Sequence, residues 1–398
     1  MAKYIKYSLI LYIYYFPYVY LCVLSSYSVL NRSAVEKRAG QVFKKKFYPM
    51  FDFKQGDNVT IGSTGNILDC IVHAAITEDF IENGTEVLRL RKRGVPAPRT
   101  VRYHLEKLVI DDILSQFNGI SEELYRIAKK QRWFVNKVDL SIDIHDWMYY
   151  GDIDDEMVLG TQPKNGTSYA YKFATINVVE RGIRFTLKAL PIGDYSEICG
   201  VVEELLKYAM KKVKIRSVYL DRGFYAVPIV RMLKRLSVHF IIQAQKSIGI
   251  KKVIEENKDK EVIVVDYKMK RKRKAPSGKE DVRLFIVPHR LKKDKRVCFV
   301  TNLDVNEENA KDYAGNYRKR WGIETSYRVK KDAFRPKTTS KNYAIRLFFF
   351  LFSVSFYNLW VLASIVLGLV LNGRLPEKPL ITAKMFGNLL ITAYDSGG

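Results

Sequence analysis

The stretch VDLSIDIH, residues 138–145, alternates apolar and polar side chains along its whole length. One side of the stretch carries Val138, Leu140, Ile142 and Ile144, and the other carries Asp139, Ser141 and Asp143. This period of two predicts a β-strand with one apolar face in a core and a second face that presents carboxylates.

The residues that follow have the pattern of a mixed α/β sheet. Two further strand candidates, linked closely as in an antiparallel meander, are YAYKFATINVV (169–179) and GIRFTLKALPI (182–192). Next come an amphipathic helix (196–214), the short strand SVYLDRGFY (217–225), a helix (226–236) and the strand HFIIQAQ (239–245). Three strands, a helix, a strand, a helix and a strand is the order of an RNase H-like sheet.

Beyond Gln245 the alternation of strand and helix stops. Three strand candidates remain, EVIVVDYK (261–268), VRLFIVPH (282–289) and RVCFVTN (296–302). Highly charged segments separate them, which predicts a small β insertion with basic hairpins. The runs KMKRKRK (268–274) and KKDKR (292–296) either clamp DNA or form solvated hairpins.

The residues before the first strand read mostly as helix, from about 33 to 132. Within them Pro98 can open a helix that points Arg99, Thr100, Arg102 and Tyr103 outward. Such a helix suits a helix-turn-helix reader of DNA. A solvated basic helix explains the same residues equally well.

Two uncharged segments raise the question of a membrane. Residues 7–31 follow Lys3 and Lys6 and resemble an anchor, but they hold many tyrosines and a proline, which also suits a packed or spurious extension. Residues 347–373 are long enough to span a bilayer. Its internal asparagines, Asn358 and Asn372, make a buried core helix the preferred interpretation.

Composition points to a polyanion as partner. Lysine and arginine number 67 against 42 aspartates and glutamates, a formal charge of +25 spread along the chain. Nucleic acid is the first candidate for such a surface. The four cysteines form no CxxC pair and have no histidine at zinc-ligand spacing, so neither a zinc site nor a disulfide framework is indicated.

The segment YRKRWGIETSYRVKK, residues 317–331, keeps one carboxylate, Glu324, among six cations. On a regular helix Tyr317, Arg320, Glu324 and Lys331 fall within a sector of about 60°. Ile323, Tyr327 and Phe334 share an adjacent sector that can dock on a core, and Pro336 ends the helix. Trp321 either packs or stacks on a base, and packing is preferred.

Two other acids suggest what Glu324 does. Asp143 lies in the first strand and Asp221 at the end of the fourth, and these strands are neighbours in the proposed sheet. The three carboxylates can therefore converge. Oxygen ligands suit Mg²⁺ or Mn²⁺, and two such ions support in-line phosphoryl transfer.

These motifs resemble a known family. Tyr317, Arg320, Glu324 and Lys331 match Y-x2-R-x3-E-x6-K at every spacing, Trp321 follows the arginine, and Asp221 stands in LDRGFY. The first motif matches best at Asp143 in LSIDIHD, with Asp139 and Asp146 as rivals. Over residues 133–371 the chain resembles the insertion-sequence transposases of the DDE, RNase H-like superfamily that carry the YREK signature. The 103 positions from Asp221 to Glu324 fit the β domain that this group inserts there.

The resemblance implies cut-and-paste DNA transposition. By carry-over, Asp143, Asp221 and Glu324 would hold two Mg²⁺ or Mn²⁺ ions, and Tyr317, Arg320, Lys331 and Arg222 would contact DNA. The partners would be double-stranded DNA, as terminal inverted repeats and target, and a second copy of the chain in the DNA complex, with no membrane partner. The expected location is the cytoplasm, at the nucleoid.

The predicted organisation combines these observations. It comprises a hydrophobic extension (1–32), a helical and possible DNA-binding domain (33–132), a catalytic domain in two parts (133–246 and 304–373), the β insertion (247–303) and a tail (374–398). Three alternatives stay open at this stage: a nuclease or resolvase without strand transfer, an inactive DNA-binding derivative, and a membrane protein.

Overall fold

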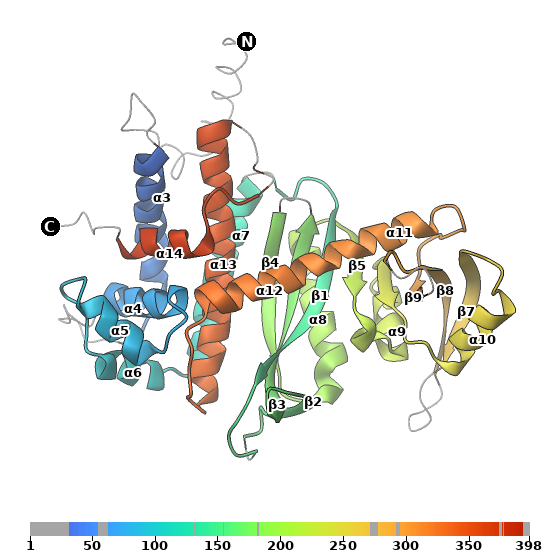
Figure 1. The fold of residues 1–398 in the computed structure, drawn as a ribbon, viewed down its shortest axis with the longest axis horizontal. Coiled ribbons are helices and arrows are strands. Elements are labelled where there is room, and N and C mark those ends of the chain that lie inside the picture. The colour runs from blue at the N-terminus through green and yellow to red at the C-terminus, as the bar shows by residue number, and fades with distance from the viewer. Residues whose placement is uncertain are drawn as a thin grey trace, which may run out of the picture. The chain divides into compact units, whose positions relative to one another are not determined.

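The chain forms two compact units in the computed structural model, which describes residues 32–54, 63–130, 133–153, 155–180, 183–270, 278–291, 295–373, 376 and 378–392 (Figure 1). Unit 1 takes its residues from 1–133, 181–185 and 325–398, and unit 2 from 134–180 and 186–324. The uncharged segment 7–31 and the centres of both basic runs, 271–274 and 292–294, lie outside the described residues.

Unit 2 is built on a mixed sheet with flanking helices, as the sequence predicts. Its strands are β1 (Val138–Met148), β2 (Leu159–Lys164), β3 (Thr167–Glu180), β4 (Ile183–Ile192), β5 (Ile215–Leu220), β6 (Phe240–Gln243), β7 (Ile263–Lys270), β8 (Lys279–Pro288) and β9 (Arg296–Thr301). They run in the order β2-β3-β1-β5-β6-β9-β8-β7, with β4 paired to β3. The helices of this unit include α8 (Ile198–Lys212), α9 (Val227–Arg235) and α11 (Ala310–Tyr317).

The centre of the sheet follows from the alternation in β1. Leu140 and Ile142 are fully buried on one face. β1 pairs in parallel with β5 and antiparallel with β3, so it is covered on both edges. The first strand and the fourth predicted strand are therefore neighbours, as expected.

One strand, β2, was not predicted from the sequence pattern. β2 pairs with β3 through a tight hairpin, and the sequence predicted no strand there. Asn165 and Gly166 both have positive φ, +53° and +84°. That backbone suits a two-residue turn of the Asn-Gly type, which is a strong hairpin signal. β2 was missed because LGTQPK lacks apolar alternation.

The predicted β insertion is not a separate domain. β9 pairs antiparallel with β6, β8 with β9 and β7 with β8, so the three strands extend the main sheet. An unpredicted helix, α10 (Ile248–Glu256), precedes them. The Ser247 hydroxyl accepts a hydrogen bond from the Ile250 amide and caps this helix, which corrects the expectation that helices stop after Gln245.

Unit 1 is helical. It contains α3 (Arg32–Phe47), α4 (Thr64–Ile76), α5 (Ile81–Arg89), α6 (Pro98–Glu106), α7 (Ile110–Lys130), α13 (Tyr343–Asn372) and α14 (Ala383–Ile391). Pro98 occupies the first turn of α6, and Arg99, Arg102 and Tyr103 on this helix are exposed, as the sequence indicates. Thr100 is half-buried.

Helix α13 is the one described helix that is long and apolar enough to cross a membrane, and 94% of its apolar window is buried within the protein. Phe352 stacks on Phe348 and Phe356, with ring centroids 5.9 and 4.0 Å apart, and Phe51 contacts all three. Its neighbours are α7, α3 and α14. The helix therefore packs in a core of unit 1, as the preferred interpretation of this segment predicts.

Candidate active site

Strand register places two of the predicted acids side by side. Ile142 of β1 is the partner of Leu220 of β5 in a parallel ladder. Asp143 and Asp221 are the next residues on these two strands, so both follow the same register position. Because β1 and β5 are paired in parallel, the register brings these acids together although they are distant in sequence.

The Asp221 carboxylate is fixed by the turn that follows it. Its Oδ1 accepts a 2.7 Å hydrogen bond from the amide of Gly223. A Cβ added to Gly223 would lie 3.0 Å from that same oxygen, so a larger residue would crowd the carboxylate. The sequence LDRGFY thus sets the orientation of an acid through the small residue two positions later.

Glu324 enters the site from a helix that is less regular than predicted. Residues 318–320 form a 3-10 turn, η4 (Arg318–Arg320), between α11 and α12 (Trp321–Phe334). The segment 317–331 is therefore not one continuous α-helix, and the predicted single face is wrong. Glu324 lies in the first turn of α12, where an acid interacts favourably with the helix dipole.

Arg320 lies among the three acids. Its Nη2 is 3.0 Å from Glu324 Oε1 and its Nη1 is 4.0 Å from Asp143 Oδ1. Its guanidinium also interacts electrostatically with Asp221, and its side chain is only 10% exposed. One buried cation therefore has all three predicted acids as neighbours.

The environment of Asp143 disfavours its charge. Burial, as the main cause, raises the pKa of Asp143 to about 7; Asp221 and Glu324 raise it further, and Arg320 lowers it. A carboxyl group in this position gains from any additional cation that reaches it.

The two rival first acids have other partners. Asp139 accepts hydrogen bonds from Lys319 and Arg216, at 2.5 and 3.0 Å. Asp146 accepts a hydrogen bond from Lys172 at 2.7 Å and another from a threonine hydroxyl. Of the three candidates on β1, Asp143 is the one that interacts with Asp221 and Glu324.

Tyr317 does not have the phosphate-contacting position predicted for it. The residue is 4% exposed, and its hydroxyl donates a 3.1 Å hydrogen bond to the carbonyl of Leu220. Its ring packs against Tyr219 and Phe299. Tyr317 therefore attaches α11 to β5, through its hydroxyl and through the packing of its ring in the core of unit 2.

The remaining predicted DNA contacts are exposed. Arg222 directly follows Asp221 in a short 3-10 turn, and its side chain faces solvent. Lys331 is also exposed, and it belongs to unit 1. Trp321 is 64% exposed, which contradicts the preference for packing.

The docking face of the same segment behaves as predicted. Ile323 and Phe334 are buried at 1% and 0% exposure, and Tyr327 at 9%. Helix α12 ends at Phe334, two residues before Pro336.

The acids are suitable in kind for a divalent metal ion. All three offer carboxylate oxygens, the donors that Mg²⁺ and Mn²⁺ prefer, and all are electrostatically coupled. As they stand, however, no group of three or more His, Cys, Asp or Glu side chains in the described part of the chain could hold a metal ion. The Arg320 guanidinium supplies the positive charge among them in this structure.

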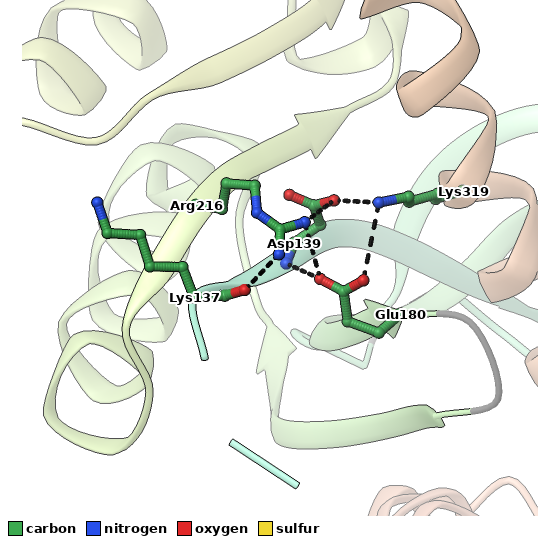
Figure 2. A network of polar contacts seen from close by, with 5 residues as sticks. All are labelled: Lys137, Asp139, Glu180, Arg216 and Lys319. Atoms are coloured by element: carbon green, nitrogen blue, oxygen red, sulfur yellow. Dashed lines mark hydrogen bonds and ion pairs between the residues drawn. The ribbon is translucent and has the colours of Figure 1, made fainter. Parts of the chain in front are cut away.

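Sequence reasoning missed a second group of charges beside the site. Lys319, Arg216 and Glu180 surround Asp139 at the start of β1 (Figure 2). The one available signal was Lys319 itself, which directly precedes the signature arginine.

A mixed α/β unit with acids on two neighbouring strands and on one helix defines the class of site. Residues 196–359 match the family model described as a transposase DDE domain. This segment contains Asp221 and Glu324 and begins after Asp143. The match supports a DDE transposase.

A solved structure shares the fold. The chain is similar to the piggyBac transposase in a cryo-EM structure of its synaptic complex with hairpin DNA, with a TM-score of 0.56 and 12% identity. The similarity covers 93% of this chain and 78% of the other. Comparison with curated proteins finds no match.

Proposed function

We propose that this protein is a DDE transposase of the YREK group that moves an insertion sequence by cut-and-paste transposition. The observation that carries the proposal is the meeting of Asp143, Asp221 and Glu324 around Arg320. The three acids come from the middle of β1, the end of β5 and a helix, and the family match covers two of them. A purely structural ion pair needs one acid, whereas this arrangement gathers three.

Asp143, Asp221 and Glu324 would hold Mg²⁺ or Mn²⁺, two ions in all. When bound, such ions activate an attacking oxygen and stabilise the leaving oxygen in an in-line displacement. The chain's own contribution is orientation: the Gly223 amide fixes Asp221, and the parallel register fixes Asp143 beside it.

Arg320 is suited to receive a DNA phosphate. Its Nε–H is buried and has no acceptor among the residues that the structure describes. A phosphate oxygen would supply that acceptor, and arginine binds phosphate through paired donors. Arg222 and Lys331 remain proposed contacts to the DNA backbone, because both are exposed cations.

Double-stranded DNA is the proposed partner, both as the inverted repeats at the element's ends and as target. The net charge of +25 supports this, as does the DNA in the piggyBac complex. Pairing of two ends would require two copies of the chain. We place the protein in the cytoplasm, at the nucleoid.

The test is cleavage of the DNA that brackets the protein's own reading frame. The full chain is incubated with a linear fragment carrying those flanks and with Mg²⁺. Asp221→Asn and Glu324→Gln are expected to abolish nicking at the repeat ends and to retain binding in a mobility-shift assay. Glu203→Gln, an acid on α8 that pairs with Lys207 and Arg235, is the matched control and should cleave normally.

Full cleavage by either site variant would remove the assignment of these acids. A pre-cut end separates the remaining alternatives. Joining of that end to target DNA supports transposition, and hydrolysis without joining indicates a nuclease or resolvase. Binding without cleavage in any divalent metal indicates an inactive DNA-binding derivative.

A further inference from the structure

The charges around Asp139 form a closed network at the start of β1 (Figure 2). Asp139 is 1% exposed, and its Oδ2 accepts hydrogen bonds from Lys319 Nζ at 2.5 Å and Arg216 Nη1 at 3.0 Å. Glu180 Oε1 accepts from Arg216 at 3.3 Å, and Glu180 Oε2 is 3.7 Å from Lys319. Two acids and two cations thus pair through Asp139 Oδ2 and the Glu180 carboxylate, whereas Asp139 Oδ1 is buried without a hydrogen-bond partner among the described residues.

The network also closes the end of the sheet. The backbone amide of Asp139 donates a 2.8 Å hydrogen bond to Glu180 Oε1, where the β1–β3 ladder stops at Leu140 and Val178. Arg216 Nη2 donates to the carbonyl of Lys137 at 2.6 Å. The network therefore joins three strands, β1, β3 and β5, because the polar residues at their ends are bonded to one another.

Lys319 connects this network to the three acids of the candidate active site. Lys319 and Arg320 are consecutive residues of the 3-10 turn η4, and Asp139 and Asp143 lie on the same face of β1, four residues apart. Lys319 reaches Asp139, and Arg320 reaches Asp143 and Glu324. The turn is thus attached to β1 at two points, and the carboxylate at the Lys319 end, Asp139, is almost completely buried.

We propose that the Asp139–Lys319 ion pair, supported by Arg216 and Glu180, is a positioning device that sets η4 on β1 and thereby presents Arg320 and Glu324 to Asp143. Its role in the reaction rests on the proposed function. Lys319 acts through its neighbours and has no contact with substrate in this role. Asp139, a rival catalytic acid by sequence, becomes the anchor of that device.

The geometry explains why this anchor matters for the acids. Glu324 is 56% exposed, and Arg320, its ion-pair partner, is only four residues away, so this pair alone does not locate the first turn of α12, residues 321–324, on β1. The Lys319 bond to a buried carboxylate does. A displacement of about 1 Å at a reacting group can cost about 100-fold in rate.

The test compares Lys319→Met with Lys319→Arg, which keeps the charge. Hydrogen exchange of the full chain without metal or DNA is measured first, at the amides of residues 318–324. Lys319→Met is expected to exchange faster there than wild type, while Lys319→Arg stays close to wild type. Lys311→Met is the control: Lys311 lies on the preceding helix, α11, and forms an exposed ion pair with Glu261. This variant should leave the exchange rates of residues 318–324 unchanged.

Single-turnover cleavage is measured next. Lys319→Met should slow cleavage about 10- to 100-fold, with DNA affinity changed less than about 3-fold. In a double-mutant cycle, Asp139→Asn together with Lys319→Met should lose little more than the worse single variant, because each acts through the other. If Lys319 instead binds DNA, the effects add and the salt dependence of binding becomes shallower.

The outcomes separate the two proposals. If Lys319→Met exchanges at the wild-type rate, the positioning role is overturned whether or not the protein cleaves DNA. The positioning role is also overturned if Lys319→Met cleaves DNA at the wild-type rate. Faster exchange in Lys319→Met, combined with no cleavage by the wild-type protein, overturns the proposed function and leaves the structural role of the ion pair in place. Arg216→Met, which removes the second cation of the network, is also measured. If it keeps the wild-type melting temperature and shows the same faster exchange at residues 318–324, global misfolding is excluded as the cause of the faster exchange.

Discussion

The charge of Arg320 faces all three acids. Its guanidinium is 3.0 Å from Glu324 and 4.0 Å from Asp143. Breaking a fully buried ion pair costs about 3 to 5 kcal/mol, and solvent around the exposed Glu324 reduces this. We therefore expect Arg320→Gln to lower the free energy of unfolding by about 2 kcal/mol in urea with EDTA present.

Arg318→Gln provides the comparison for that variant. Arg318 is in the same 3-10 turn but is exposed, so its loss should cost less than about 0.5 kcal/mol. Equal losses for the two variants would mean that the acids do not depend on Arg320.

Tyr317 allows packing and DNA binding to be told apart. Its hydroxyl donates to the Leu220 carbonyl at 3.1 Å inside unit 2. Tyr317→Phe leaves that carbonyl without this donor and should lower the free energy of unfolding by about 1 kcal/mol. DNA affinity, measured by fluorescence anisotropy, should stay at the wild-type value. Weaker DNA binding at unchanged stability would restore the phosphate contact that the sequence suggested.

At the scale of elements, α4 and α5 are joined through a buried histidine. The Nδ1–H of His73 donates to the carbonyl of Gly84 at 2.8 Å. A Cβ on Gly84 would lie 2.8 Å from Ala74 Cα, so glycine is what permits this close approach. Burial is the main cause that lowers the pKa of His73, which keeps the ring neutral between the helices.

This histidine predicts a direction of pH dependence. Below about pH 6.5 the unfolded chain takes up a proton at His73, and the folded protein resists it. The contribution of His73 to stability is therefore complete above that pH and falls as the pH decreases. His73→Gln should show a smaller drop in melting temperature from pH 7.5 to 5.5 than wild type. His239→Gln, at an exposed position, should keep the wild-type drop.

The elements also show where local patterns mislead. The predicted face of residues 317–331 assumed a regular α-helix, but the chain tightens into a 3-10 turn at 318–320. The turn is stabilised by Lys319 and Arg320 binding acids on β1, and a helical pattern carries no information about those partners.

For the whole molecule, the net charge of +25 predicts salt-dependent DNA binding. Proteins that neutralise several phosphates lose about 10³ to 10⁵ in affinity between 50 and 200 mM salt. We expect a loss of at least about 10-fold for a linear duplex over this range, measured by fluorescence anisotropy. Asp221→Asn should keep the same slope, because it changes the acids and none of the cations. Affinity that is independent of salt would contradict DNA binding through the basic surface.

Composition alone left the interpretation of the long apolar segment open at this scale. Its apolar residues predict a helix in a bilayer or in a core with equal ease. Burial against α7, α3 and α14 identifies it as core, and Phe51 and Phe117, far away in sequence, both contact Phe348. No pattern within residues 347–373 specifies these partners.

The sequence by itself determined the strands with strong alternation, the helical character of residues 32–130 and the acids at positions 143, 221 and 324, because side-chain periodicity and short motifs are local properties. It preferred Asp143 as the first acid and left Asp139 and Asp146 as rivals on the same strand. Tertiary structure separated them: Lys319 takes Asp139, Lys172 takes Asp146, and Asp143 is the one beside Asp221 and Glu324. The physical reason is that charge partners are chosen by strand register and burial, and these depend on residues as far apart as Asp139 and Lys319, 180 positions along the chain.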